Sequence, residues 1–159
     1  MKISIRKGLG FGLTSGIITT LGLIIGLIYS THSKLVVLTG ILTIAIADSF
    51  SDALGIHISE ESGNKRITKK EIWESTLATF FSKLIFAISF IFPFLIFSLI
   101  NAMILSIIWG MFLIILFSYY ISKIQEANPW KAILEHVLIT IFVIFATYFI
   151  GSWISNIFA

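Results

Sequence analysis

The sequence contains no cysteine and few charged residues, and each absence excludes a class of protein. Without thiols there are no disulfide bonds and no thiolate metal sites. Charged residues make up 12% of the 159 residues and hydrophobic residues 57%, and the mean hydropathy is +1.02. A soluble protein needs more charge to cover its surface. The composition therefore predicts a single membrane domain spanning residues 1–159, with much of its surface facing lipid.

The sequence also lacks the motifs of soluble enzymes. It has no serine-hydrolase elbow, phosphate-binding loop, zinc-protease helix or glycine-rich dinucleotide turn. We therefore expect no enzyme activity and no bound cofactor. The net charge is +3, but the basic residues flank apolar runs, which indicates membrane topology and not a nucleic-acid partner.

The predicted fold class is an all-α integral membrane protein with five transmembrane helices. About 20 apolar residues of helix, at ~1.5 Å each, cross a bilayer core. The apolar stretch after residue 73 is too long for one crossing, so a turn is expected near Pro93 or residues 98–101. The predicted helices are 8–29, 35–58, 73–98, 101–122 and 132–158, and 59–71 is predicted to be a cytoplasmic loop.

Basic residues concentrate at one end of the predicted helices, which predicts the orientation. The first apolar run is too long for a signal peptide, so we expect it to be retained. The bias places the N-terminus in the cytoplasm and the C-terminus on the opposite side. A turn is predicted at Gly63-Asn64. The basic residues of the cytoplasmic side are Lys2, Arg6, Lys7, Lys65, Arg66, Lys69, Lys70, Lys123 and Lys131, whereas only Lys34 lies on the other.

Two acidic residues, Asp48 and Asp52, lie one turn apart inside the second predicted helix. A carboxylate inside a membrane costs a few kcal/mol, so it must be paired, protonated or hydrated. Two carboxylates at this spacing repel each other when both are ionised, and a shared proton or a bound cation would relieve the repulsion. This pair is the strongest candidate for a metal site.

Lys83 is the basic residue predicted to lie at a similar depth, about ten residues into the third helix. Three interpretations stay open from the sequence. Lys83 forms a structural ion pair with an aspartate, or extends along the helix to the cytoplasmic headgroups, or takes part in charge-coupled transport.

Small residues form a stripe along the first predicted helix. Such stripes let two helices approach closely, either within one subunit or across a dimer seam, and we expect the seam. Its glycines are Gly8, Gly12, Gly16, Gly22 and Gly26, with Ser15 and Thr19 between them. Glu135 and His136, at the start of the last helix, are weaker candidates for proton handling, and a solvated helix end is the alternative.

Several segments resemble the vacuolar iron transporter (VIT) family, which includes the nodulin-like proteins. Residues 15–22 (SGIITTLG) look like its first-helix signature, Asp-Gly-x-Val-Thr-Thr. Residues 47–55 (ADSFSDALG), with Ser59 and Ser62, are similar to its second-helix pattern, Ala-(Asp/Gly)-x-x-Ser-Met-Gly-x-Gly-Glu-Tyr-x-Ser. Further matching segments are residues 77–80 (LATF), 92–94 (FPF), 128–129 (NP) and 147–151 (TYFIG).

The resemblance implies a homodimer that moves Fe²⁺ and related divalent metals such as Mn²⁺ out of the cytoplasm in exchange for protons. The metal is then a transported substrate and not a cofactor. It implies an integral protein of the lipid bilayer, which we expect in the cell membrane of a prokaryote. The first helices would line a path along the two-fold axis.

The sequence departs from the family pattern at the residues that matter for metal. Ser15 replaces the first-helix acid, Asp52 replaces the second-helix Met, and Ile56 replaces a Glu. Residues 59–71 are also too short for the metal-gathering domain of longer members, so this is a short form. Exchanging a thioether for a carboxylate favours harder ions such as Mn²⁺, Mg²⁺ or Ca²⁺.

The first hypothesis is therefore a divalent-cation transporter with Asp48 and Asp52 at its centre. Ser15 and Thr19 would add neutral oxygens to that site. Glu60 and Glu61 would attract cations at the cytoplasmic mouth. The alternatives are a non-transporting membrane scaffold or partner subunit, and a transporter of small organic cations.

Overall fold

The computed structural model describes residues 2–63 and 67–158, and these are helical with short connections and no strand. Five helices, with α3 and α4 counted as one, are long and apolar enough to cross a membrane. The predicted fold class is confirmed. The elements are α1 (Ile3–Thr31), α2 (Lys34–Gly63), α3 (Lys69–Ser89), α4 (Ile91–Ile96), α5 (Leu99–Ile124) and α6 (Pro129–Phe158).

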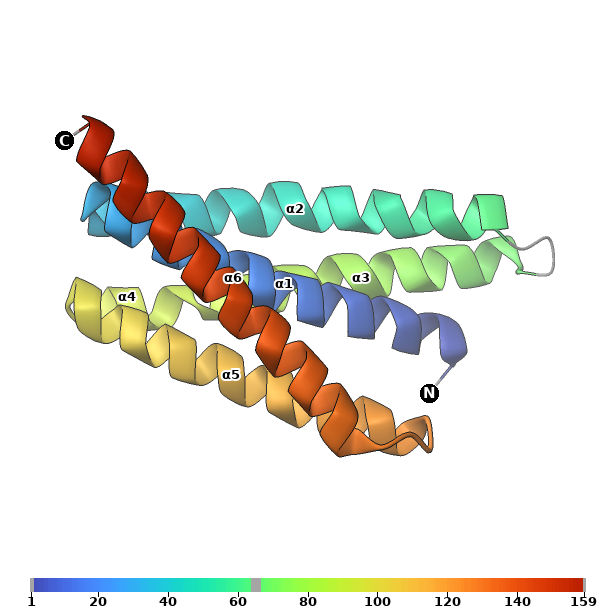
Figure 1. Cartoon of the computed structure of the whole chain (residues 1–159). Coiled ribbons are helices and arrows are strands. Elements are labelled where there is room, and N and C mark those ends of the chain that lie inside the picture. Colours follow the sequence, from blue (N-terminus) through green and yellow to red (C-terminus); the bar gives the residue numbers. More distant parts are fainter. Residues whose placement is uncertain (1, 64–66, 159) are drawn as a thin grey trace.

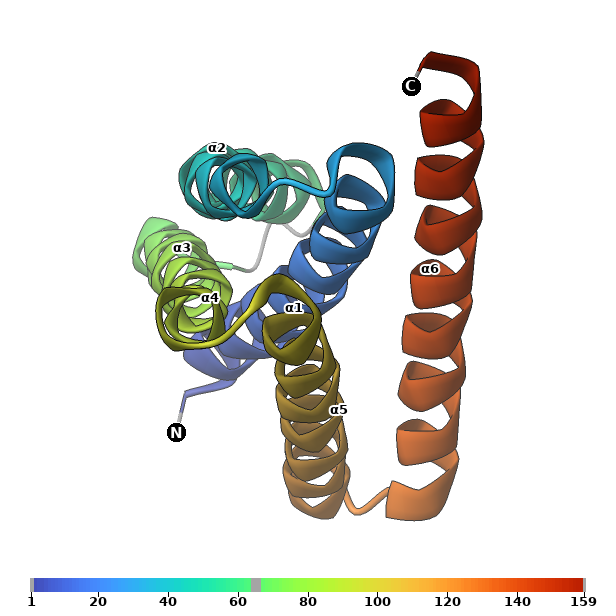
Figure 2. The same cartoon turned by 90° about the vertical axis from the view of Figure 1, so that its left-hand side faces the viewer.

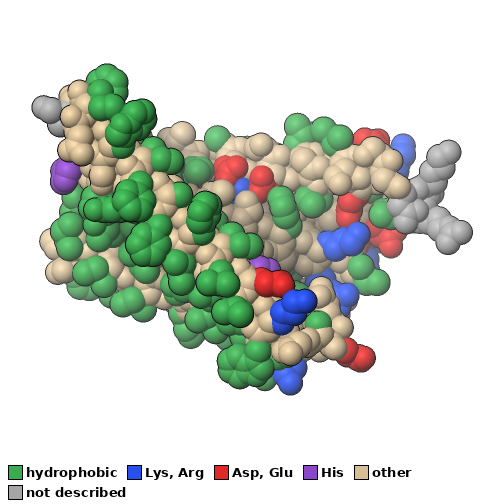
Figure 3. Space-filling model, in the orientation of Figure 1, with side chains coloured by type: hydrophobic (Ala, Val, Ile, Leu, Met, Phe, Trp, Pro, Cys, Tyr) green, Lys and Arg blue, Asp and Glu red, His purple; other side chains and the backbone are tan. Residues whose placement is uncertain are grey.

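The two termini lie at opposite ends of the bundle (Figure 1). The connection between α5 and α6 lies at the same end as the N-terminus. Lys and Arg side chains gather toward this end in Figure 3, as the topology prediction requires. The cytoplasmic orientation of this end stays a prediction. Asn64, Lys65 and Arg66, which belong to the predicted turn and basic loop, lie outside the described residues.

The helices extend beyond the apolar segments from which they were predicted. α2 continues to Gly63 and α3 begins at Lys69, so most of the predicted loop 59–71 is helical. A capping box starts α3: the Glu71 backbone N–H donates to Thr68 Oγ1 at 3.3 Å, and the Thr68 N–H donates to Glu71 Oε2 at 2.9 Å. Hydropathy identifies only the part of a helix that lies within lipid, so it does not detect the polar residues by which α2 and α3 extend beyond their predicted ends.

Pro93 interrupts the third span without turning the chain. Proline has no N–H, so the Ser89 carbonyl four residues earlier loses its helical partner, and α3 ends at Ser89. The short α4 then continues to Ile96, and the chain turns at Phe97 and Ser98.

Helix α1 lies at the centre of the bundle and packs against α2, α3, α5 and α6 (Figure 2). Its core residues Ile17, Leu21 and Ile24 are completely buried. Helix α6 packs against α1 and α5 and lies apart from α2. One face of α1 is therefore left uncovered between α2 and α6. The outer surfaces of α5 and α6 expose large apolar side chains, as a lipid-facing surface requires.

The α1 glycines pack against helices of the same chain. A Cβ atom at Gly8 would overlap the Ser75 carbonyl oxygen, and one at Gly12 would overlap the Thr79 carbonyl oxygen. A Cβ atom at Gly16 would lie 3.2 Å from Lys83 Cγ. These three glycines therefore let α1 lie directly against α3.

The other two glycines of the stripe face α6. A Cβ atom at Gly22 would lie 2.9 Å from Val143 Cγ1, and one at Gly26 would lie 3.8 Å from Thr147 Cβ. The predicted dimer seam is therefore corrected for Gly8, Gly12, Gly16 and Gly22, which pack tightly within the subunit. Gly26 makes an ordinary contact with α6 and stays partly exposed beside it. Sequence periodicity shows that a close contact exists but not which helix makes it.

We expect Gly12→Ala to lower the free energy of unfolding by about 1–3 kcal/mol, the usual cost of overpacking a tight contact. The added methyl group would push α1 away from the Thr79 backbone. Thermal unfolding in detergent, followed by tryptophan fluorescence, measures this change. Gly55→Ala is the matched control, because a Cβ atom there has no neighbour within 4 Å. Equal stability of the two variants would contradict the packing.

Candidate functional site

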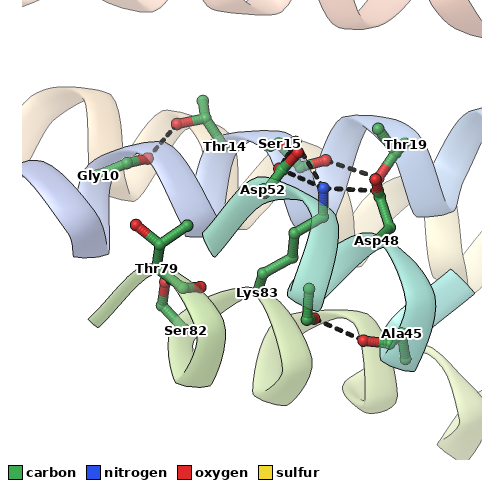
Figure 4. Close-up of polar contacts among 11 residues, drawn as sticks. Gly10, Thr14, Ser15, Thr19, Ala45, Asp48, Asp52, Thr79, Ser82 and Lys83 are labelled. Atoms are coloured by element: carbon green, nitrogen blue, oxygen red, sulfur yellow. Dashed lines mark hydrogen bonds and ion pairs between the residues drawn. The ribbon is translucent and has the colours of Figure 1, made fainter. Parts of the chain in front are cut away.

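Three helices contribute charged or polar side chains to one cluster inside the bundle (Figure 4). Asp48 and Asp52 come from α2, where a spacing of four residues puts them on the same face. Lys83 reaches them from α3, and Ser15 faces them from α1. We call Asp48, Asp52, Lys83 and Ser15 the aspartate–lysine cluster.

Lys83 Nζ is the centre of this cluster. It lies 2.5 Å from Asp48 Oδ2 and donates a 2.8 Å hydrogen bond to Ser15 Oγ. It also donates to Asp52 Oδ2, which in turn accepts a 2.7 Å hydrogen bond from Ser15 Oγ. Lys83 is only 1% exposed. One ammonium group thus bridges both aspartates and the central helix.

This geometry decides between two of the interpretations of Lys83. The side chain points at the aspartates, so its extension to the headgroups is wrong for this structure, and the ion pair is present. A buried ion pair repays the desolvation of its charges only with good geometry and further hydrogen bonds. Ser15 supplies those hydrogen bonds here.

The two carboxylates have unequal surroundings. Asp52 Oδ2 accepts hydrogen bonds from both Lys83 and Ser15. Asp48 Oδ2 is buried and contacts the Lys83 ammonium at 2.5 Å, and it accepts no hydrogen bond from any other described residue. Its negative charge is therefore compensated by the nearby positive charge alone, so it is the carboxylate whose acceptor capacity is least used.

A groove leads to the cluster from one end of the bundle. It has a volume of about 880 Å³ and lies between α1 and α2. It begins near Leu35, at the start of α2, and reaches Asp48 and Ser51, at a distance of about 24 Å along the helix axis. Thr19, Thr39 and Thr43 add hydroxyl groups to its wall. Figure 3 shows acidic and basic atoms at the surface midway along the bundle, away from the charged end.

The predicted neutral ligands are only partly available. Ser15 is already bonded to Asp52 and Lys83. The Thr19 hydroxyl donates to the Ser15 carbonyl at 2.8 Å while its side chain lines the groove. Within residues 2–63 and 67–158, no three His, Asp or Glu side chains are grouped as a metal would require. The cluster as it stands holds an ammonium group in the place where a cation would bind.

The two glutamates at the end of α2 have different environments. Glu60 has a side chain 10% exposed, lies 3.6 Å from Lys7 Nζ and accepts a hydrogen bond from the Ser75 hydroxyl. It therefore ties α2 to α1 and α3. Glu61 is exposed. Only Glu61 has the open position expected of a cation-attracting residue.

Glu135 and His136 lie on α6, away from the cluster. Glu135 is exposed, whereas His136 Nδ1 lies 2.7 Å from Ser118 Oγ on α5. The structure brings neither into contact with Asp48 or Asp52. Their role in proton handling stays a prediction.

Sequence reasoning missed a second polar group at the N-terminal end of α1. Lys2 Nζ lies 2.5 Å from Glu74 Oε1, and Ser4 donates a 2.8 Å hydrogen bond to Glu74 Oε2. With Lys7 and Glu60, these contacts fasten α1 to its neighbours at this end. Charges of both signs at the helix ends were the only available signal, and they do not specify partners.

Comparison with models of known protein families gives a match. The model of the VIT family matches residues 52–152, which is more than half of the chain and includes Asp52 and Lys83. No curated protein matches the sequence. The matched segment begins within α2 and ends within α6.

Proposed function

Since the chain belongs to the VIT family, a family of membrane metal-ion transporters, we propose that it exports divalent metal cations from the cytoplasm in exchange for protons. In this proposal the protein is a homodimer in the cell membrane of a prokaryote. Its cargo is Mn²⁺ or Fe²⁺, and Asp48 and Asp52 bind the cargo.

The observation that carries the proposal is the groove that reaches Asp48, the first of the two paired carboxylates. Asp48 lines the groove, and Asp48 and Asp52 are 27% and 19% exposed at the side chain. An ionisable pair inside a membrane that faces an open cavity is typical of an ion pathway. The groove extends from Leu35 at the start of α2 as far as Asp48 and Ser51, which fits a path that approaches the carboxylates from this end.

The donor atoms favour hard divalent ions. The cluster and groove offer carboxylate and hydroxyl oxygens, without thiolate or thioether. Such oxygens suit Mn²⁺, Mg²⁺ and Ca²⁺ better than softer metals. We therefore rank Mn²⁺ above Fe²⁺ as cargo.

The open face between α2 and α6 supports the homodimer. The groove beside α2 lies on this face, and so does a second depression beside α6, lined by Gly26, Ser30 and Gly151. A second copy seated there would enclose the groove. The interface would then use the outward sides of α1, α2 and α6, including Gly26, and not the four α1 glycines that pack tightly inside the subunit.

A second candidate function is a non-transporting membrane scaffold or partner subunit. The observation that favours it is the ammonium of Lys83, which already compensates the aspartates. A cluster that serves only to fasten α2 and α3 would need no exchange of ions.

Metal flux into proteoliposomes distinguishes the two. We expect the purified protein to move Mn²⁺ faster than Fe²⁺ or Ca²⁺, with a rate that depends on an imposed pH gradient. Asp52→Asn should lower the Mn²⁺ flux by at least about tenfold, since even an outer-sphere partner of a metal is worth that much.

Glu126→Gln is the control, because it removes an exposed carboxylate from the α5–α6 connection, outside the cluster. Its flux should equal that of the unaltered protein. Absence of Mn²⁺, Fe²⁺ and Ca²⁺ flux from folded protein would reject the transporter and favour the scaffold. Flux that Asp48→Asn and Asp52→Asn leave unchanged would reject this site.

A further inference from the structure

Lys83 occupies the position in which a cation cargo would bind. Its Nζ is surrounded by Asp48 Oδ2, Asp52 Oδ2 and Ser15 Oγ. Hard metal ions take the same kind of ligand set, carboxylate and hydroxyl oxygens. The ammonium and a metal ion therefore compete for one group of acceptors.

The bundle is shaped to hold this lysine. The α1 residue that faces its stem is Gly16, and a Cβ atom there would lie 3.2 Å from both Lys83 Cγ and the Lys83 carbonyl oxygen. Any larger residue would crowd the stem. Beyond Cγ, the two flexible carbons Cδ and Cε lead to Nζ, so the ammonium can change position while the first part of the stem stays packed.

The net charge of the cluster determines whether a divalent cation can bind while the Lys83 ammonium is in place. Two ionised aspartates carry a total charge of −2, and Lys83 reduces it to −1. A divalent cation added beside the ammonium would leave a net charge of +1 and place two positive charges close together next to a buried lysine, which is unfavourable. With the ammonium withdrawn, the same cation would neutralise the pair.

We propose that Lys83 is the specificity-determining residue of the cargo site, acting as a tethered cation that competes with the metal. A divalent cation binds between Asp48 and Asp52 only when Nζ withdraws, and the return of Nζ displaces the cargo. Asp48 is partly exposed and lines the groove, so it is the first ligand that an entering ion would meet. This inference rests on the proposed function, since it concerns the same site.

The test is Mn²⁺ binding to the purified protein in detergent, measured by titration calorimetry. We expect Lys83→Met to bind Mn²⁺ more tightly than the unaltered protein by at least about tenfold, because one nearby positive charge is removed. Lys83→Arg keeps the charge and should bind weakly. Lys131→Met is the matched control, since Lys131 is exposed near the start of α6 and lies outside both the groove and the cluster, and it should leave affinity unchanged.

Flux measured on the same variants distinguishes two roles of Lys83: displacing the bound cargo during transport, or only blocking the site. Lys83→Met should bind tightly yet transport slowly, because no internal cation displaces the cargo. If Lys83→Met misfolds without metal, it can be refolded in the presence of Mn²⁺. The rise of its unfolding temperature with Mn²⁺ concentration then gives its Mn²⁺ affinity for comparison with the unaltered protein. The triple variant Asp48→Asn/Asp52→Asn/Lys83→Met has a neutral cluster and should not bind.

The outcomes distinguish this inference from the proposed function. Equal Mn²⁺ affinity of the unaltered protein and Lys83→Met, with affinity lost in Asp52→Asn, would overturn the role of Lys83 and leave the transporter standing. Mn²⁺ binding by neither protein, both folded, would overturn the cargo site itself.

Discussion

Replacing Lys83 with methionine is expected to lower the free energy of unfolding by about 3 kcal/mol in the absence of metal. The side chain is 2% exposed and bridges two aspartates. Its removal would leave both carboxylates partly buried and repelling each other. Breaking one side of a buried ion pair is more damaging than removing the whole pair, because the remaining charge stays desolvated.

Neutralising the partners should restore most of the lost stability. In Asp48→Asn/Asp52→Asn/Lys83→Met the amides keep the shape of the carboxylates without their charge, and Ser15 can still donate a hydrogen bond. Thermal unfolding in detergent, followed through the four tryptophans, measures all variants under one condition. A triple variant as unstable as Lys83→Met would show that the stem, and not the charge, stabilises the bundle.

A cysteine at Thr43 is expected to react with a hydrophilic thiol reagent at least about tenfold faster than one at Ile108, because the reactive thiolate forms readily only in water. Thr43 lines the groove, whereas Ile108 is 60% exposed on α5, which bears apolar side chains. Each lies nine residues from the start of its helix, and both helices start at the same end. The two sites are therefore matched in depth.

The chain suits this experiment because it contains no cysteine of its own. Each single substitution then gives one reactive group without background. Fast reaction of the Thr43→Cys variant from the outside of intact cells would show a water-filled groove and would place the α1–α2 end outside. Equally slow reaction of both variants would show a dry groove and would favour the scaffold.

Much of the fold follows from properties local in the sequence. The length and apolarity of each segment predict five spans, and the charges at their ends predict the topology. The Asp48 and Asp52 pair can be recognised from the sequence because placing a carboxylate within the membrane costs free energy, whichever residues surround it. Helix ends were less well predicted, since α2 and α3 extend into polar residues that hydropathy ignores.

The partners of these residues were decided by the tertiary structure. Lys83 had three open interpretations in the sequence, and the packing of α3 against α1 and α2 directs it to the aspartates. The packing of α3 against α1 also encloses Gly8, Gly12 and Gly16 within the subunit, although a dimer seam was predicted for them.

The physical reason is that spacing fixes which residues share a helix face but not what that face meets. The sequence by itself determined a five-span membrane protein with an acidic pair that needs compensation. Only the tertiary structure decided that a lysine from another helix compensates that pair, and that a groove leads to it.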